Sequence, residues 1–214
     1  MKIQQNISLK NYNTFGIEVF AKRFVSITSY YDFQQLLKTE KDLFLISGGS
    51  NMLLTKDIDK LVVHIDIKGI SIDNEDDNFV YITVNAGENW HELVLWTLEH
   101  NYGGLENMSL IPGNTGTAPI QNIGAYGVEL KDTFVSCEAM NIATQEIETL
   151  IEGCREHSGD GKSCTRCNYG YGLKDGKCEK DVCGEGCDSC EFSSSKYVCQ
   201  FCKAGYAADT EDET

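Results

Sequence analysis

The chain has 214 residues and a formal net charge of −15, with 18 basic residues against 33 acidic ones. So acidic a protein is disfavoured as a partner of nucleic acid, whose phosphates would repel it. The first ten residues, MKIQQNISLK, lack the apolar core of a secretory signal, and no apolar run approaches the length needed to cross a bilayer. We therefore expect a chain made in the cytosol, without a membrane span.

The distribution of cysteine divides the sequence into two parts. Cys137 is the only cysteine before residue 151, whereas nine cysteines follow it. Both parts are acidic, with 10 basic against 20 acidic residues in the first and 8 against 13 in the second. We expect two domains, residues 1–150 and residues 151–214. Dense cysteine suits disulfides, so the second would fit an extracellular or oxidising compartment and the first the cytoplasm.

Hydrophobic periodicity predicts two helices and several strands in the first part. Ser29 is a plausible cap for a helix that buries Phe33, Leu36 and Leu37. Three short stretches rich in β-branched residues, 43–47, 60–65 and 80–87, predict strands. A second helix is expected to begin at Asn89 and to end at Gly103-Gly104, and its apolar surface is expected from Leu93, Trp96 and Leu98. These elements predict the α+β class.

The isolated histidines, tryptophans and Cys137 have simple structural interpretations. His64 lies in a predicted strand, and His91 and His100 lie on the second helix, so packing or surface positions are favoured over catalytic ones. Trp90 and Trp96 are expected in the core. Cys137, in the apparent strand TFVSCEAM, is expected to be a buried thiol.

Two glycine-rich loops carry the most unusual chemistry. The first loop, SGGSNMLL (residues 47–54), follows a predicted strand, and its two glycines allow consecutive N–H groups to converge on an anion. The second loop, LIPGNTGTAPIQNIGAYG (residues 110–127), holds both prolines of the chain. Neither loop contains lysine or arginine, so a phosphate would be held by backbone N–H groups and neutral side chains, here Ser47, Ser50, Asn51, Thr115 and Thr117. The first motif alone is also compatible with a simple tight turn.

Longer segments extend these loops into a family pattern. They are NTFGI (13–17), SGGSNMLL, NAGENWHELV (85–94), GLENMSLIPGNTGTAPIQNIGAYGVEL (104–130) and NIATQEIETL (141–150). Together they closely resemble the UDP-N-acetylenolpyruvoylglucosamine reductases (MurB), NADPH-dependent flavoenzymes of peptidoglycan synthesis and cell wall biogenesis, also called UDP-N-acetylmuramate dehydrogenases.

The resemblance implies the FAD-binding fold shared with the vanillyl-alcohol-oxidase class. In such a fold the first loop meets the FAD pyrophosphate and the second lines the flavin. The FAD-binding residues that it implies here are Thr14, Ser47, Gly48, Gly49, Ser50, Asn51, Ile111, Pro112, Gly113, Gly116, Thr117, Gln121, Asn122, Gly124, Ala125 and Tyr126.

The same resemblance predicts that the catalytic groups are missing. In the family, NADPH reduces FAD, and the flavin then passes hydride to UDP-N-acetylglucosamine enolpyruvate with the help of an arginine, a serine and a glutamate. The arginine belongs to an FGYR motif that follows the equivalent of residues 141–150, where this chain reads REHSGDG. The serine and glutamate regions have no counterpart. We therefore expect a truncated reductase sequence that binds FAD without catalysing the reaction, and we assign no catalytic residue.

The tail repeats a cysteine pattern about one and a half times. A shift of 35 residues superimposes Cys164 and Cys167 on Cys199 and Cys202. Disulfides and zinc sites are both compatible with this spacing, and the scarcity of aliphatic residues favours disulfides. The repeats resemble the furin-like or growth-factor-receptor cysteine-rich repeats of extracellular surface proteins. The alternative function is therefore an extracellular binding module, dominated by loops, whose partner is unidentified. In this alternative the chain is a chimera joined near residues 151–154. We assign no metal ligand.

Overall fold

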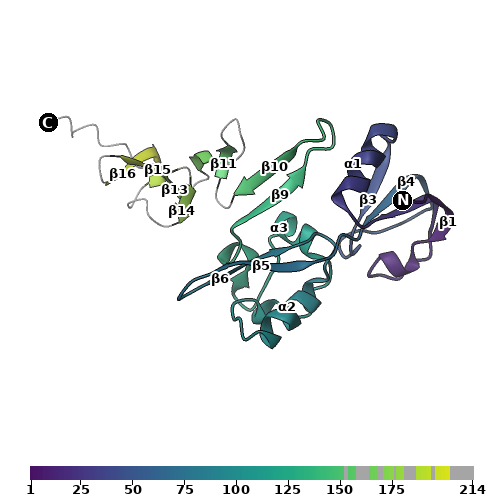
Figure 1. The fold of residues 1–214 in the computed structure, drawn as a ribbon, viewed down its shortest axis with the longest axis horizontal. Coiled ribbons are helices and arrows are strands. Elements are labelled where there is room, and N and C mark those ends of the chain that lie inside the picture. Colours follow the sequence, from purple (N-terminus) through teal and green to yellow (C-terminus); the bar gives the residue numbers. More distant parts are fainter. Residues whose placement is uncertain are drawn as a thin grey trace. The chain divides into compact units, whose positions relative to one another are not determined.

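A computed structural model describes residues 1–151, 154–157, 164–167, 171–175, 177–180, 187–193 and 196–202. They belong to two compact units, Met1–Thr133 and Phe134–Thr214, which are described separately (Figure 1). Among the described residues, no helix is both long and apolar enough to span a membrane. The domain boundary expected between residues 150 and 151 stays a prediction.

The first unit is built on a four-stranded mixed sheet with the strand order β1-β2-β4-β3. Strand β1 pairs antiparallel with β2, whereas β2 and β3 both run parallel to β4. The four strands are β1 (Gln4–Ser8), β2 (Phe20–Ile27), β3 (Leu43–Ile46) and β4 (Ile58–Ile65). Buried residues of three of these strands, Phe24, Ile46 and Val62, share one hydrophobic core with Leu9.

Helix α1 (Tyr30–Thr39) connects β2 to β3, as the parallel pairing requires (Figure 1). Its N-cap is Ser29, whose hydroxyl accepts a hydrogen bond from the Asp32 N–H at 3.1 Å. Phe33, Leu36 and Leu37 are all buried. The predicted helix, its cap and its apolar face are confirmed.

A hairpin and a second helix follow the sheet. Strands β5 (Ile70–Glu75) and β6 (Val80–Val84) pair antiparallel, and helix α2 (Trp90–Glu99) begins at the N-cap Asn89. The predicted end of this helix at Gly103-Gly104 is wrong. The helix ends at Glu99 because Asn101 adopts φ 61°, its N–H bonds the carbonyl of Leu98 at 3.0 Å, and the Tyr102 N–H bonds that of Thr97 at 2.9 Å. This pattern is a Schellman motif in which asparagine replaces the usual glycine.

The apolar face of α2 also differs in part from the prediction. Trp90, Leu93 and Val94 are buried, as expected of the first two, whereas Leu98 keeps 48% of its surface exposed. Trp96 is half-buried, and its ring stacks on His100 with centroids 4.1 Å apart.

Short elements complete the first unit. They are η1 (Lys10–Tyr12), η2 (Glu106–Met108), η3 (Thr115–Thr117), α3 (Ala118–Gln121), β7 (Gly124–Ala125), β8 (Val128–Glu129) and η4 (Leu130–Asp132). Four of them, from η3 to β8, lie on the second glycine-rich loop or directly after it. This loop is therefore a structured segment and not an open connection.

The described part of the second unit consists of strands. Strands β9 (Ser136–Met140) and β10 (Ile147–Ile151) form a hairpin, and β11 (Cys154–His157) pairs with β12 (Cys164–Cys167). Strands β13 (Tyr171–Lys174), β14 (Lys177–Lys180), β15 (Cys187–Ser193) and β16 (Lys196–Cys202) form a sheet in the order β14-β13-β15-β16. Cys137 lies in β9 as expected, although it is half-buried, and burial raises the pKa of its thiol.

Candidate functional site

The first glycine-rich loop begins directly after β3 and is fixed against the N-terminal segment. Gly49 adopts φ 60°, and a Cβ at this position would lie only 2.8 Å from Cα of Asn13 and would collide with the carbonyl of Tyr12. The Thr14 N–H donates to the Gly49 carbonyl at 3.2 Å. The segments NTFGI and SGGSN are therefore held together by backbone contacts that only glycine permits.

Several hydrogen-bond donors in this loop have no acceptor in the part of the chain that the structure describes. The N–H groups of Gly48, Gly49, Ser50 and Asn51 donate to no acceptor among the described residues of the chain. The hydroxyl oxygen of Ser47 is also buried without a hydrogen-bond partner in that part of the protein. A buried donor without an acceptor is unfavourable, and consecutive N–H groups that point the same way attract an anion, so their concentration here indicates a site for a ligand that supplies acceptors.

The second glycine-rich loop lies directly against the first. A Cβ on Gly48 would come within 2.8 Å of Cα of Gly113, and one on Gly113, which has φ 122°, would come within 2.8 Å of the Ser50 hydroxyl. Thr117 is close to the same point, with its hydroxyl 3.8 Å from the position of the Gly113 Cβ. The structure thus brings together both loops that the sequence singled out, through contacts that exclude any side chain.

Segment 85–90 fixes the second loop through backbone hydrogen bonds. The Gly116 N–H bonds the Ala86 carbonyl at 3.1 Å, the Thr115 N–H bonds that of Glu88 at 2.9 Å, and the Trp90 N–H bonds that of Gly113 at 3.0 Å. The position of a Cβ on Gly116 is only 2.5 Å from Cβ of Ala86. Sequence reasoning quoted NAGENW as a motif but gave it no role. The segment contacts the second loop through its own backbone groups, so its residue types did not signal this role.

The distal half of the second loop forms a separate group. Asn122 closes α3 with φ 40°, and β7 and β8 are joined by a two-residue turn in which Tyr126 and Gly127 have φ 53° and 82°. Such a turn requires two positive φ angles, and tyrosine is an unusual residue for it. Tyr126 keeps 90% of its surface exposed. This hairpin therefore presents an aromatic ring to solvent at the expense of backbone strain.

The same hairpin borders an open pocket of about 340 Å³. Its lining consists of Asn122, Gly124, Ala125, Gly127, Val128 and Glu129. Hydrogen bonds from Lys131 and Asn122 lower the pKa of the Glu129 carboxyl, so this acid is ionised at neutral pH. Of the residues that the resemblance implied, Asn122, Gly124 and Ala125 thus line this pocket, and Gln121 lies on the neighbouring helix α3.

One histidine that sequence reasoning treated as packing or surface contacts the start of the second loop. Nδ1 of His91 lies 3.2 Å from the Ser109 hydroxyl and accepts the Leu110 N–H at 3.4 Å. His91 is half-buried in the first turn of α2. The other two keep structural roles: His100 stacks on Trp96, and His64 lies edge-on to Tyr12, with burial lowering the pKa of the His64 imidazole.

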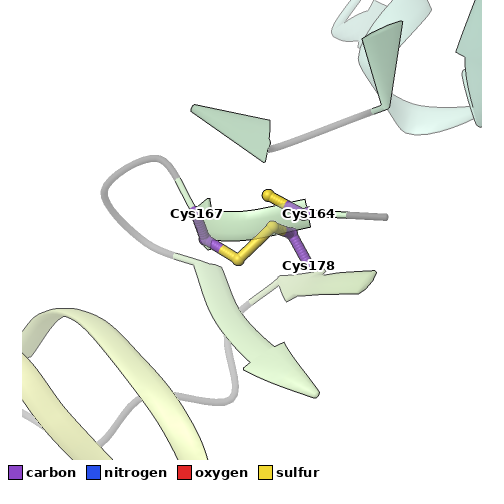
Figure 2. A group of neighbouring side chains, drawn as sticks. All are labelled: Cys164, Cys167 and Cys178. Carbon is purple, nitrogen blue, oxygen red and sulfur yellow. A yellow bond between two sulfur atoms is a disulfide. The ribbon is translucent and has the colours of Figure 1, made fainter. Parts of the chain in front are cut away.

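Three cysteines of the tail come together (Figure 2). Cys167 and Cys178 form a disulfide with Cα atoms 5.7 Å apart, and all three sulfurs, that of Cys164 included, lie within 4.8 Å of one another. A sulfur in a disulfide is not a thiolate and cannot serve as a metal ligand while oxidised. The zinc interpretation of the spacing would combine Cys164 and Cys167 with a second pair, Cys187 and Cys190, whose side chains lie outside the described part of the tail.

Comparison with known proteins identifies the family to which residues 22–150 belong. The model of the FAD binding domain family matches residues 22–150, which is more than half of the chain. The chain belongs to the FAD binding domain family. FAD is accordingly its cofactor, and both glycine-rich loops, residues 47–54 and 110–127, lie within the matched region.

Two curated relatives of this FAD-binding chain carry the same name. UDP-N-acetylenolpyruvoylglucosamine reductase of Flavobacterium johnsoniae is 57% identical over 173 residues, covering 80% of this chain and 48% of the relative. The protein of the same name from Amoebophilus asiaticus is 49% identical over 148 residues, covering 67% and 44%. The chain therefore spans about half the length of the curated relatives that it matches. The Flavobacterium match also covers more of the chain than residues 1–150 comprise, so it continues past residue 150.

A solved structure supports the fold. The crystal structure of UDP-N-acetylenolpyruvylglucosamine reductase (MurB) from Thermus caldophilus superimposes with a TM-score of 0.57 at 21% identity, covering 71% of this chain and 53% of that one. The expected mixed fold of the FAD-binding type is thereby confirmed. The furin-like resemblance of the tail has no support among these matches and stays a prediction.

Proposed function

We propose that residues 1–150 form the FAD-binding part of a UDP-N-acetylmuramate dehydrogenase and hold FAD mainly through backbone groups of the two glycine-rich loops. The observation that carries the proposal is the row of four N–H donors from Gly48 to Asn51, which lies against Gly113 and has no acceptor among the described residues. A pyrophosphate offers several acceptor oxygens and negative charge to such an array.

The orphaned hydroxyl of Ser47 fits the same ligand. A buried hydroxyl without a partner is unfavourable, and a phosphate oxygen would supply the missing acceptor. Thr14 is held beside Gly49, so it lies at the edge of the same array. The remaining implied residues near this point are Ser50, Gly116 and Thr117, whose polar or backbone atoms border Gly113 and Ala86.

The flavin ring is assigned to the remainder of the second loop. Ile111 and Pro112 precede Gly113, and the hairpin beyond Gln121 adds Asn122, Gly124, Ala125 and the exposed Tyr126. Bound FAD supplies hydride chemistry between a nicotinamide and a substrate. The chain's own contribution, in this proposal, is to bind and orient the cofactor with a loop whose backbone is fixed by segment 85–90.

The rest of the family reaction involves NADPH and a UDP-sugar substrate, UDP-N-acetylglucosamine enolpyruvate. We propose that the 214-residue chain alone does not catalyse it, because the sequence REHSGDG stands where the family arginine motif is expected. Charge that develops on the enolpyruvyl group needs positioned stabilising groups and a proton donor. Among the described residues, nothing we assign to the FAD site supplies them.

For the tail we propose a disulfide-stapled module of about one and a half cysteine repeats joined near residues 151–154. The Cys167–Cys178 disulfide supports this interpretation over zinc. Such a module would require an oxidising compartment, in contrast to the reductase-like part.

Direct measurement of flavin binding tests the main proposal. The purified chain, denatured and refolded with excess FAD and then passed through a desalting column, should retain a flavin absorbance spectrum at close to one flavin per chain. When apoprotein is added to FAD in increasing amounts, the fluorescence of the flavin should be quenched until the quenching reaches a plateau. A correctly folded protein that stays colourless and gives no saturable quenching would refute the proposal.

A matched pair of glycine variants locates the site. Gly48→Ala places a Cβ within 2.8 Å of Cα of Gly113 and forces the two loops apart, so FAD binding should weaken at least tenfold. Gly103→Ala is the control, because its Cβ would meet only the Glu106 carboxylate at an ordinary 3.8 Å. Equal FAD affinities for the two variants would place the pyrophosphate elsewhere.

A further inference from the structure

The first turn of α2 holds the start of the second loop at three successive points. The indole N–H of Trp90 donates to the Met108 carbonyl at 2.8 Å, and the backbone N–H of Trp90 donates to the Gly113 carbonyl. Between these two anchors, Nδ1 of His91 meets Ser109 and Leu110. The segment 108–113 thus enters the proposed flavin region along a path set by two adjacent residues of one helix.

The middle anchor lies at a strained position. Leu110 adopts φ 64°, a left-handed conformation that is unfavourable for a residue with a Cβ, and keeps 75% of its side chain exposed. Burial of the leucine side chain therefore does not hold this conformation. Among the described residues, the Leu110 N–H donates its hydrogen bond to Nδ1 of His91.

The chemistry of imidazole makes this contact specific. Nδ1 accepts the Leu110 N–H in the tautomer that carries its proton on Nε2. In this tautomer the Ser109 hydroxyl, 3.2 Å away, is a second donor that shares the single lone pair of Nδ1. A hydrocarbon of similar size at position 91 would leave both donors without this acceptor.

We propose that His91 is a positioning residue for the flavin: by accepting the Leu110 N–H it fixes the left-handed turn that directs Ile111 and Pro112 toward the isoalloxazine. This inference rests on the proposed function, because it assumes that Ile111 and Pro112 face the flavin. It assigns to His91 a role beyond the packing or surface position that its sequence context suggested.

Three substitutions separate positioning from simple packing. In His91→Asn the side-chain carbonyl oxygen can replace Nδ1 as an acceptor, whereas in His91→Gln the same group lies one methylene further out. His91→Leu removes the acceptor altogether. Each protein is refolded with FAD, and the dissociation constant and the visible circular dichroism of the bound flavin are measured.

Loss of the acceptor should weaken FAD binding by about three- to tenfold and change the flavin dichroism, the size expected for one hydrogen bond. The asparagine variant should stay within about twofold of the wild type and keep its spectrum, and the glutamine variant should resemble the leucine one. Wild-type affinity and spectrum in the leucine variant would overturn the inference, as would equal behaviour of the asparagine and glutamine variants. If His91→Leu does not fold, the asparagine and glutamine comparison still decides. Failure of the wild type to bind FAD would instead refute the proposed function.

Discussion

Replacing Ser47 with alanine should change stability and cofactor binding in opposite directions. The Ser47 hydroxyl oxygen is buried and has no hydrogen-bond partner among the described residues, so the apoprotein carries an unsatisfied polar group. Leaving such a group unpaired costs about 1–3 kcal/mol. Removing the hydroxyl while keeping the Cβ should therefore stabilise the apoprotein by about 1 kcal/mol, equivalent to a rise in Tm of about 2–4 °C for a chain of this size.

The same substitution should weaken FAD binding. In the proposed complex the hydroxyl donates to a charged phosphate oxygen, and hydrogen bonds to charged groups contribute about 1.5–3 kcal/mol. Ser47→Ala should therefore raise the dissociation constant for FAD by about tenfold to a hundredfold. The two effects have opposite signs because the unpaired hydroxyl destabilises the apoprotein, whereas the same hydroxyl stabilises the complex with FAD.

The assay combines thermal unfolding of the apoprotein, followed by circular dichroism, with fluorescence titration of FAD. Ser29→Ala is the matched control, because Ser29 caps α1 and takes no part in the proposed site. It should lower stability by about 1 kcal/mol and leave FAD affinity unchanged. A Ser47→Ala protein that is less stable than the wild type without FAD, or that binds FAD equally well, would refute the reasoning.

Three further expectations concern titration, thiols and catalysis. Burial lowers the pKa of His64, so the unfolded chain binds the proton first as pH falls. The contribution of neutral His64 to the free energy of unfolding is therefore complete above the unfolded pKa of about 6.5 and is lost as pH falls through the folded pKa. Urea unfolding at pH 7.5 and 5.5 should show a smaller loss for His64→Gln, and equal losses would contradict the assignment. Under denaturing, non-reducing conditions about two thiols should react, Cys137 and one from the odd set of nine, whereas zinc-dependent protection of most cysteines would reverse the disulfide proposal. The chain with bound FAD should show no oxidation of NADPH that depends on UDP-N-acetylglucosamine enolpyruvate. Turnover near that of an intact relative would show that the chain does contain catalytic residues.

Local chemistry explains what the sequence could predict about the elements. Helix α1 was predictable because its cap at Ser29 and its apolar face both depend on residues within one short window. The end of α2 was not, because Asn101 and Gly103 are both able to adopt a left-handed conformation and sequence alone does not rank them. Strand β2 was missed because its apolar positions lie among Lys22, Arg23 and Ser26, and its strand identity depends on pairing with β4 across a long separation.

The candidate site was predictable as composition and not as geometry. Gly48 and Gly49 indicated a sharp turn whose N–H groups converge on an anion, but only the fold shows that the neighbour of Gly48 is Gly113. The supporting segment 85–90 and the anchor at His91 act through hydrogen bonds to backbone groups about 20 to 30 residues away. Backbone partners leave no trace in residue type, so no pattern in the sequence could identify them.

The absence of lysine and arginine from both loops gives the proposed site a particular physical character. Residues 1–150 carry 10 basic against 20 acidic residues, so long-range electrostatics do not attract an anionic cofactor. Recognition must then depend on short-range, directional donors: the N–H groups from Gly48 to Asn51 and the Ser47 hydroxyl. Such donors act only when phosphate oxygens lie within hydrogen-bonding distance, and that distance is available only because Gly48 and Gly113 carry no side chains. Affinity therefore depends on how accurately the two loops are held in place. In the proposed site, segment 85–90 and His91 contribute to FAD affinity in this way, because they fix the second loop without contacting the phosphates.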